Sequence, residues 1–356
     1  MKFVSKCLKD MKQYKSIDLF KFFCAFLIIV LHTSPFSSYS NILTFGIRNI
    51  ITIIAVPFFF ISSGFMVFKK LETFEIQNEK NAYMKKHIKR IIIMYLFWSA
   101  VYFVFILLDW IFNGFSIYAL LEYIKDFVFE GSLATIWFLP ALIVATLIVF
   151  FLRQKYSYKT IFLVSLPFYV FALLGSSYYG ITEKLPILSN VFTLYYSFFD
   201  TIKNGLCFGF IYVSLGALIA YYENRICISK SKTLILIFIF FVLVAIEQIG
   251  LRCLNLSIKG IDTIIMLVPL SFLIFIFILK MNCKGDDKIY LLFRKYSMLM
   301  FLTQRIPLTI VSMFLNNTII ATNSIIYFFV ILLTTFIIST IILKITNKIK
   351  FLKYAY

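Results

Sequence analysis

Residues 17–36 read IDLFKFFCAFLIIVLHTSPF, an almost unbroken apolar stretch. A helix needs about 20 mostly apolar residues to cross the hydrocarbon core of a membrane, and this stretch has that length. Similar stretches recur along the 356 residues, of which 62% are hydrophobic, well above the roughly 45–50% of a soluble domain. The sequence therefore predicts an all-α fold, a polytopic integral membrane helix bundle rather than a soluble domain with one anchor.

The apolar stretches predict about ten membrane-spanning helices. Their approximate ranges are 17–36, 47–68, 90–109, 134–152, 160–177, 203–222, 232–250, 262–280, 297–315 and 324–344. The connections between them are alternately rich and poor in Lys and Arg, and the basic ones are expected in the cytoplasm. We therefore predict a multi-pass protein of the inner or plasma membrane with both termini cytoplasmic. The outer connection 110–133 is rich in aromatic residues and predicts a short interfacial amphipathic helix.

The predicted organisation is a single transmembrane domain, 17–344, between two basic cytoplasmic tails, 1–16 and 345–356. Five lysines precede the first apolar stretch and no small-residue cleavage site follows it, so the first span is expected to be retained. The net charge of +19 is dispersed between the spans rather than gathered on one face, so we expect no nucleic-acid partner. The six cysteines lack CxxC spacing, and no metal site is expected.

Charged side chains inside a span are costly and mark candidate functional sites. In the first span, Lys21 and His32 are eleven residues apart, which returns a helix to within about 20° of the same face. Asp18 precedes Lys21 by three residues, a spacing that predicts an ion pair between them. One face of this helix is thus expected to join a cytoplasmic cation to an imidazole in the outer half of the membrane.

Other polar groups are predicted at two depths. The outer group is expected to share a pocket with His32, although Trp137 and Lys203 also suit simple anchoring at the interface; its members are Trp137, Lys203, Asn204, Glu247, Gln304 and Arg305. The inner group combines basic residues with a small-residue site and suits a phosphate-bearing ligand, or merely obeys the positive-inside rule; its members are Lys86, His87, Arg90 and Ser63.

Four motifs then occur in order along the chain. They are Lys21 with His32, the stretch VPFFFISSGF at 56–65, the stretch IWFLPAL at 136–142, and KNGL at 203–206 followed by LGAL at 215–218. In this order the chain resembles the membrane acyltransferase-3 family, whose first helix carries Arg or Lys, ten residues and then His. Two positions depart from the family pattern: the basic pair before the third span appears as HIKR at 87–90, and Gln304 stands where His is frequent.

The resemblance implies transfer of an acyl group, most often acetyl, from cytoplasmic acyl-coenzyme A to a hydroxyl of a cell-envelope polysaccharide or lipid-linked glycan. Lys21, Lys86 and Arg90 would hold the coenzyme A phosphates, with His87 and Ser63 nearby. His32 would act as general base or transient acyl acceptor. Glu247 or Asp18 would balance charge, and Arg305 or Lys203 would stabilise the oxyanion. The expected partners are acyl-CoA, the glycan acceptor and membrane lipids.

Three alternatives remain open. Intramembrane charges and the prolines within the spans also suit a transporter or flippase, although no paired inverted arrangement of broken helices is evident. A related possibility, a membrane domain that imports an amino acid for a fused soluble partner, is expected less because the chain ends at Tyr356. The third is a noncatalytic family member that acts in a glycan-assembly complex, which the departure at Gln304 favours.

Overall fold

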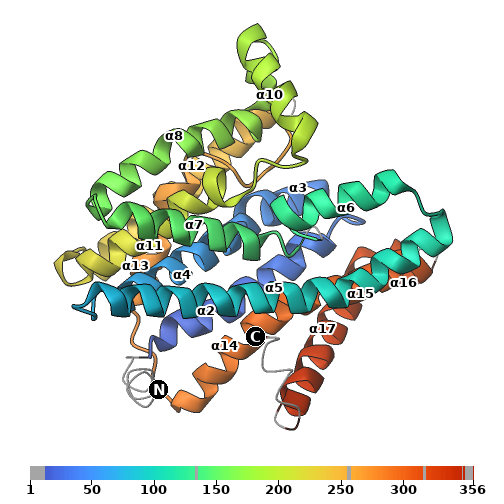
Figure 1. The fold of residues 1–356 in the computed structure, drawn as a ribbon. Helices are drawn as coiled ribbons and strands as arrows, with labels where there is room; N and C mark the ends of the chain where they lie inside the picture. The colour runs from blue at the N-terminus through green and yellow to red at the C-terminus, as the bar shows by residue number, and fades with distance from the viewer. Residues whose placement is uncertain (1–12, 133–134, 255–257, 316–317, 347, 349–355) are drawn as a thin grey trace.

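The computed structural model describes residues 13–132, 135–254, 258–315, 318–346, 348 and 356. These residues form helices and no strand. The tails predicted at 1–16 and 345–356 lie mostly outside the described residues. The helices are α2 (Lys15–Thr33), α3 (Asn41–Gly46), η1 (Ile47–Ile51), η2 (Thr52–Ile54), α4 (Ala55–Leu71), α5 (Gln77–Asn113), α6 (Ile117–Phe129), α7 (Phe138–Arg153), α8 (Tyr158–Gly175), α9 (Tyr179–Thr182), α10 (Pro186–Phe198), η3 (Gly205–Gly209), α11 (Phe210–Tyr222), η4 (Glu223–Arg225), α12 (Lys230–Cys253), α13 (Leu267–Leu279), α14 (Asp287–Thr303), α15 (Arg305–Phe314), α16 (Ile319–Thr322) and α17 (Ser324–Thr346) (Figure 1).

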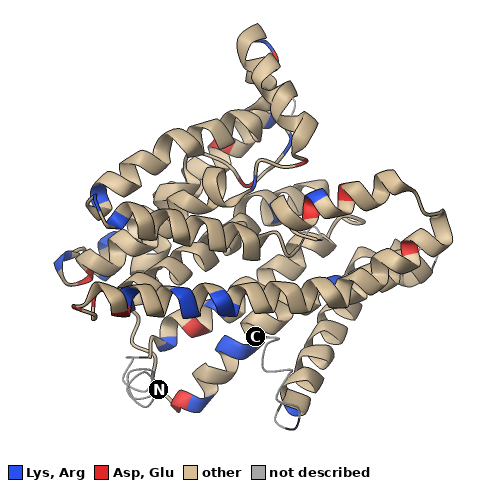
Figure 2. Ribbon diagram, viewed as in Figure 1, with Lys and Arg blue, Asp and Glu red and all other residues tan. Residues whose placement is uncertain are grey.

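The helices confirm an all-α membrane protein. Within the described residues, eight helical stretches are long and apolar enough to cross a membrane, and α7 and α13 are shorter apolar helices. Each predicted span overlaps one of these ten segments, while ten crossings and the orientation of the termini stay predictions. Figure 2 shows Lys and Arg gathered toward the end of the bundle where α5 and α14 begin, as the positive-inside rule leads one to expect.

Helices α4 and α11 form the most closely packed pair in the bundle. Gly64 of α4 lies against the backbone of Val213, and Gly216 of α11 lies against the backbone of Ile61. A Cβ atom at either glycine would overlap a carbonyl oxygen of the opposite helix. Small residues at a helix interface allow this close backbone approach. The glycines of the SSGF and LGAL stretches are therefore packing residues.

Helix α2 packs against α14 through a buried ion pair. Both carboxylate oxygens of Asp18 accept hydrogen bonds from Arg294, each at 2.8 Å. Asp18 is 3% exposed. The prediction that Asp18 pairs with Lys21 is therefore wrong, because the fork-shaped guanidinium of Arg294 occupies both oxygens.

Several spans are broken, two of them at the end of the bundle that is predicted to face outward. The second span starts with the π-helical turn η1 and the 3-10 turn η2, and the sixth starts with the π-helical turn η3. The ninth span is split between α14 and α15 next to Pro307, whose missing N–H leaves the Thr303 carbonyl without its helical partner. The Tyr102 hydroxyl donates to the neighbouring Leu302 carbonyl.

Further helices lie in the connections that are predicted to face outward. The amphipathic helix predicted within 110–133 is observed as α6, and its hydroxyl cap comes from Ser116. The connection 178–202 was expected only as a loop, yet it contains α9 and α10. Pro186 at the first turn of α10 explains this start, since its fixed φ suits that position.

Candidate functional site

A pocket of about 590 Å³ opens at the end of the bundle that is predicted to face outward, called the outer end below. Its walls come from the end of α5, from α6, from the turn before α7 and from the segment before η3. Trp137 and Lys203, both predicted pocket residues, line it together. Most of the other lining residues are acidic or aromatic: Asp109, Glu122, Asp126, Glu130, Asp200, Trp110 and Tyr123.

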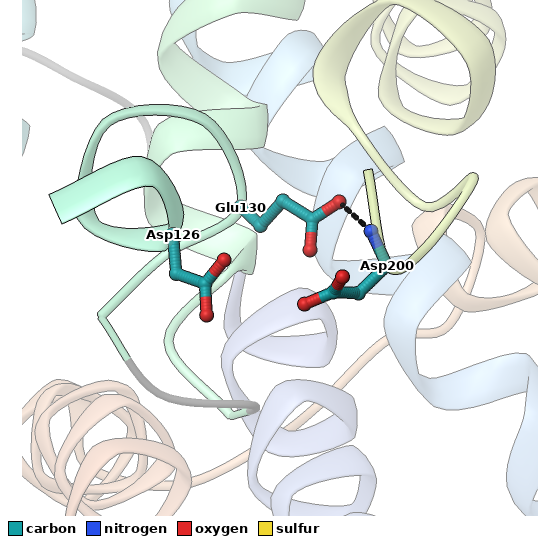
Figure 3. A group of neighbouring side chains, drawn as sticks. All are labelled: Asp126, Glu130 and Asp200. Atoms are coloured by element: carbon teal, nitrogen blue, oxygen red, sulfur yellow. Dashed lines mark hydrogen bonds between the residues drawn. The ribbon is translucent and has the colours of Figure 1, made fainter. Parts of the chain in front are cut away.

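Three of these carboxylates point toward one another (Figure 3). One oxygen from each of Asp126, Glu130 and Asp200 lies within 4.8 Å of the others. The Lys125 ammonium contacts Asp200 at 3.1 Å and Asp126 at 3.3 Å, and Glu130 accepts the backbone N–H of Asp200 at 2.6 Å. Burial raises the pKa of Asp126 and of Glu130 above the ordinary values. The ion pairs with Lys125 and the backbone hydrogen bond to Glu130 hold these three carboxylates in place, so the cluster forms a fixed, acidic part of the pocket wall.

The pocket lining restricts the chemistry of a ligand. An ionised carboxylate only accepts hydrogen bonds, and five carboxylates line this pocket. The rings of Trp110, Tyr123 and Trp137 add flat apolar surface. The lining therefore fits a molecule rich in hydrogen-bond donors, such as a polyhydroxyl compound or an amine.

His32 lies in the last turn of α2 with an exposed side chain. Arg305, Lys203 and Arg48 are all within electrostatic range of its imidazole. Lys203 is paired with Asp262 at 2.7 Å, whereas the Nε of Arg305 is buried without a hydrogen-bond partner among the described residues. The structure thus groups three predicted site residues, His32, Lys203 and Arg305, at the outer end.

Two further charged residues of this group, Arg48 and Asp262, are not among the residues predicted from the sequence. Arg48 lies in the π-helical turn η1, where a regular helix was expected. Asp262 is 7% exposed and lies at the predicted start of the eighth span, so a carboxylate at a span boundary was the available signal.

Three other predicted outer residues have separate surroundings. Gln304 is fully buried, its amide donates to the Phe301 carbonyl at 3.1 Å, and its Oε1 has no partner among the described residues. The Asn204 side chain caps η3 by accepting from the N–H groups of Leu206 and Cys207. It lines a neighbouring groove.

The Glu247 carboxylate is held by hydrogen bonds at the start of α13. Its carboxylate accepts the N–H groups of Ile265 at 2.7 Å and Met266 at 2.9 Å, and the Tyr178 hydroxyl at 2.5 Å. Carboxylates stabilise helix N-termini in this way. The contacts show a structural role, and the catalytic role predicted for Glu247 gains no support from them.

The inner residues are more dispersed. Lys21 forms no hydrogen bond or ion pair with any described residue, and Asp18 and Arg294 are within its electrostatic range. Lys86 and Arg90 are exposed, and Arg90 donates to the Tyr356 carbonyl at 3.2 Å. His87 stacks on Tyr83 at 6.4 Å between ring centroids.

Ser63 donates to the Phe59 carbonyl of its own helix at 2.8 Å. Its hydroxyl is thus satisfied within α4, next to the Gly64 contact with α11. The described contacts of Ser63 are those of a packing residue, and its predicted part in coenzyme A binding stays a prediction.

Comparison with known proteins adds the family. Residues 14–344 match the acyltransferase-3 family, described as an acyltransferase domain. The chain belongs to this family. No solved structure matches it.

Curated relatives in this comparison carry racemase names. An amino-acid racemase of Enterococcus faecalis is 27% identical over 94% of this chain and 46% of its own length. Another of the same name and organism is 34% identical over 60% of this chain and 29% of its own length. A serine/alanine racemase of Enterococcus gallinarum is 26% identical over 63% of this chain and 31% of its own length. The acyltransferase-3 chain thus spans less than half the length of these relatives.

Proposed function

We propose that this acyltransferase-3 protein transfers an acyl group, with acetyl as the first candidate, from cytoplasmic acyl-CoA to a hydroxyl group held in the outer pocket. The observation that carries the proposal is the position of His32. Its imidazole is within electrostatic range of Lys203, which lines the pocket, and of Arg305, whose Nε has no hydrogen-bond partner among the described residues. The attack of a hydroxyl group on a thioester is favoured by a base and two cations beside a pocket whose carboxylates accept hydrogen bonds from hydroxyl groups.

The step is a simple exchange of bonds. The acceptor oxygen forms a C–O ester bond while the C–S bond of the thioester breaks. The hydroxyl proton passes to His32 and the departing coenzyme A thiolate takes up a proton, so atoms and charge balance. Arg305 and Lys203 face the negative charge that develops on the carbonyl oxygen. In the alternative with a transient acyl carrier, His32 forms the first new bond and passes the acyl group on.

The lining of the pocket supports a glycan acceptor. A sugar offers many hydroxyl donors to the carboxylates and flat C–H faces to the aromatic rings. Lys21 supports the donor side, since it has no ion-pair partner among the described residues and lies one helical turn from the Asp18–Arg294 pair. These three charges leave a net positive region that suits the phosphates of coenzyme A.

The test is acetyl transfer from radiolabelled acetyl-CoA in membranes that contain the protein. Label is expected in an envelope glycan or lipid-linked saccharide fraction, and extraction with mild base should release it as acetate from an ester. Folded protein that gives no label with a full panel of envelope glycans would contradict the proposal.

A second candidate function follows from the racemase names of the relatives. The pocket also suits the ammonium group of an amino acid, and the relatives extend well beyond the segment that matches. In this candidate the membrane domain supplies an amino acid such as serine or alanine to a racemase. Saturable uptake of radiolabelled serine by cells that express the chain, without any acetyl transfer, would favour it over acyl transfer.

A further inference from the structure

We propose that the acceptor is lipid-linked, and that its apolar tail lies in a groove beside the outer pocket. This inference rests on the proposed acyl transfer. The groove has a volume of about 630 Å³ and lies among the ends of α6 and α10, the helices α7 and α8, and η3. Its lining is almost wholly apolar and includes Val128, Val144, Pro167, Phe168 and Phe171.

The groove and the pocket share a wall, and at two places in it consecutive residues of the chain line different cavities. Phe129 lines the groove, whereas the next residue, Glu130, lines the pocket. Phe199 lines the groove, whereas Asp200 lines the pocket. Backbone hydrogen bonds from Asp200 and Thr201 to Glu130 join the two sides of this wall. The two cavities are therefore adjacent, and in our proposal the substrate lies across the wall with its polar head in the pocket and its apolar tail in the groove.

The polar groups in the groove are already satisfied. The Tyr195 hydroxyl donates to the Thr201 carbonyl at 3.0 Å and accepts from the Asn204 amide at 2.9 Å. The side-chain oxygen of Asn204 accepts two backbone N–H groups. What remains for a ligand is apolar surface, which suits a hydrocarbon chain.

The occupant is the tail of the substrate rather than bulk lipid because of the neighbouring pocket. A phospholipid would bring an anionic phosphate beside five carboxylates, with Lys203 as the cation in the lining. A saccharide head instead offers hydroxyl donors to the same groups. The tail would also anchor the saccharide beside His32, raising its effective concentration there.

The test uses the full chain in lipid nanodiscs and a phosphate-free glycolipid, a monoglucosyl diacylglycerol, with a diazirine in one acyl chain. After irradiation, peptide mapping is expected to find adducts on residues 140–144 and 167–171. Unlabelled probe should compete for these adducts, while an equal concentration of phosphatidylglycerol should not. Adducts spread evenly over the lipid-facing helices would overturn the proposal.

Filling variants sharpen the test. Val144→Trp and Val128→Trp insert a ring from two different walls, and each is expected to lower labelling by roughly tenfold, equivalent to about 1.4 kcal/mol of lost binding. Val164→Trp is the matched control, because Val164 is 43% exposed on α8 and Val144 is 44% exposed on α7. Val164 is not among the residues that line the groove. Equal labelling of all three variants would also overturn the proposal.

The outcomes separate this inference from the proposed function. Groove labelling without any acetyl transfer would count against acyl transfer and support the lipid site. Acetyl transfer to a water-soluble saccharide without groove labelling would overturn the lipid site alone.

Discussion

The two ends of α2 carry charge in different ways. At the end predicted to be inner, both carboxylate oxygens of Asp18 are bonded to Arg294, and Lys21 has no ion-pair partner within the part of the chain that the structure describes. At the outer end, His32 lies among cations, next to a pocket lined by carboxylates. Under the proposed function, this difference would let one helix serve two ligands of opposite character, an anionic donor and a hydroxyl-bearing acceptor, by separating them along its length.

The largest effect is expected from His32→Ala, which removes the outer base. Acetyl transfer should fall by about 10²–10⁴-fold, the usual contribution of a positioned proton-transfer group. Labelled acetyl transfer per folded protein, with His32→Gln as the variant that keeps a polar side chain, measures it. Full activity of both variants would remove His32 from the mechanism.

A smaller effect is expected at the inner end. Lys21→Ala should raise the KM for acetyl-CoA by roughly tenfold, about 1.4 kcal/mol, because it removes a phosphate contact from within the bundle. Lys86→Ala should change the KM by less than about threefold, because Lys86 is exposed and solvent screens its charge. Equal effects of the two variants would show that the inner end binds the donor only by diffuse attraction.

The Asp18–Arg294 pair should contribute to stability. Asp18→Asn is expected to destabilise the protein by roughly 1–3 kcal/mol, less than a fully buried pair, because Arg294 is 42% exposed. Thermal unfolding in detergent measures the loss. The exchange of both residues, Asp18→Arg with Arg294→Asp, should recover part of it. An exchange no better than the single variants would assign the effect to packing rather than charge.

The smallest effect concerns pH at the outer pocket. Because burial raises the pKa of Asp126 and Glu130 above the ordinary 3.8 and 4.5, these groups take up protons at a higher pH than usual as the pH falls. The KM for the acceptor should then rise by roughly threefold, the size of one weakened hydrogen bond. Glu130→Gln should flatten this dependence.

The raised pKa values of Asp126 and Glu130 predict that the stability of the folded protein increases as the pH falls, whereas acceptor binding weakens. A raised pKa in the folded state means that the folded protein binds the proton more tightly than the unfolded chain does, so protonation of these two groups adds stability as the pH falls through the folded pKa. A melting temperature that falls together with acceptor binding would point to unfolding instead of titration of the pocket.

Much of the fold was predictable because membrane spans are long apolar runs with basic ends. All ten predicted spans overlap apolar helices, and the α6 amphipathic pattern was recognised. The breaks at η1 and η3 were not, since π-helical turns depend on contacts with neighbouring helices rather than on a local pattern. Position 205 in η3 requires glycine, because a Cβ atom there would overlap the Ala141 carbonyl oxygen and the Val144 side chain.

The candidate site was only partly predictable. The stripe from Lys21 to His32 follows from helical spacing alone. The acidic pocket does not, because its carboxylates come from α5, from α6 and from the segment before η3, which only the packed bundle brings together. The partner of Asp18 was mistaken for a similar reason: Lys21 is near in sequence, while Arg294 is on another helix.

The close contacts of Gly64 with the Val213 backbone and of Gly216 with the Ile61 backbone also limit how this molecule can move. With backbone against backbone and no side chains between them, α4 and α11 have no room to slide or rotate past each other. We therefore expect α4 and α11 to move together as one rigid unit within the bundle. Any rearrangement during turnover is then expected in the irregular turns η1, η2 and η3 and in the peripheral helices. The distance between the two ends of the bundle would be preserved.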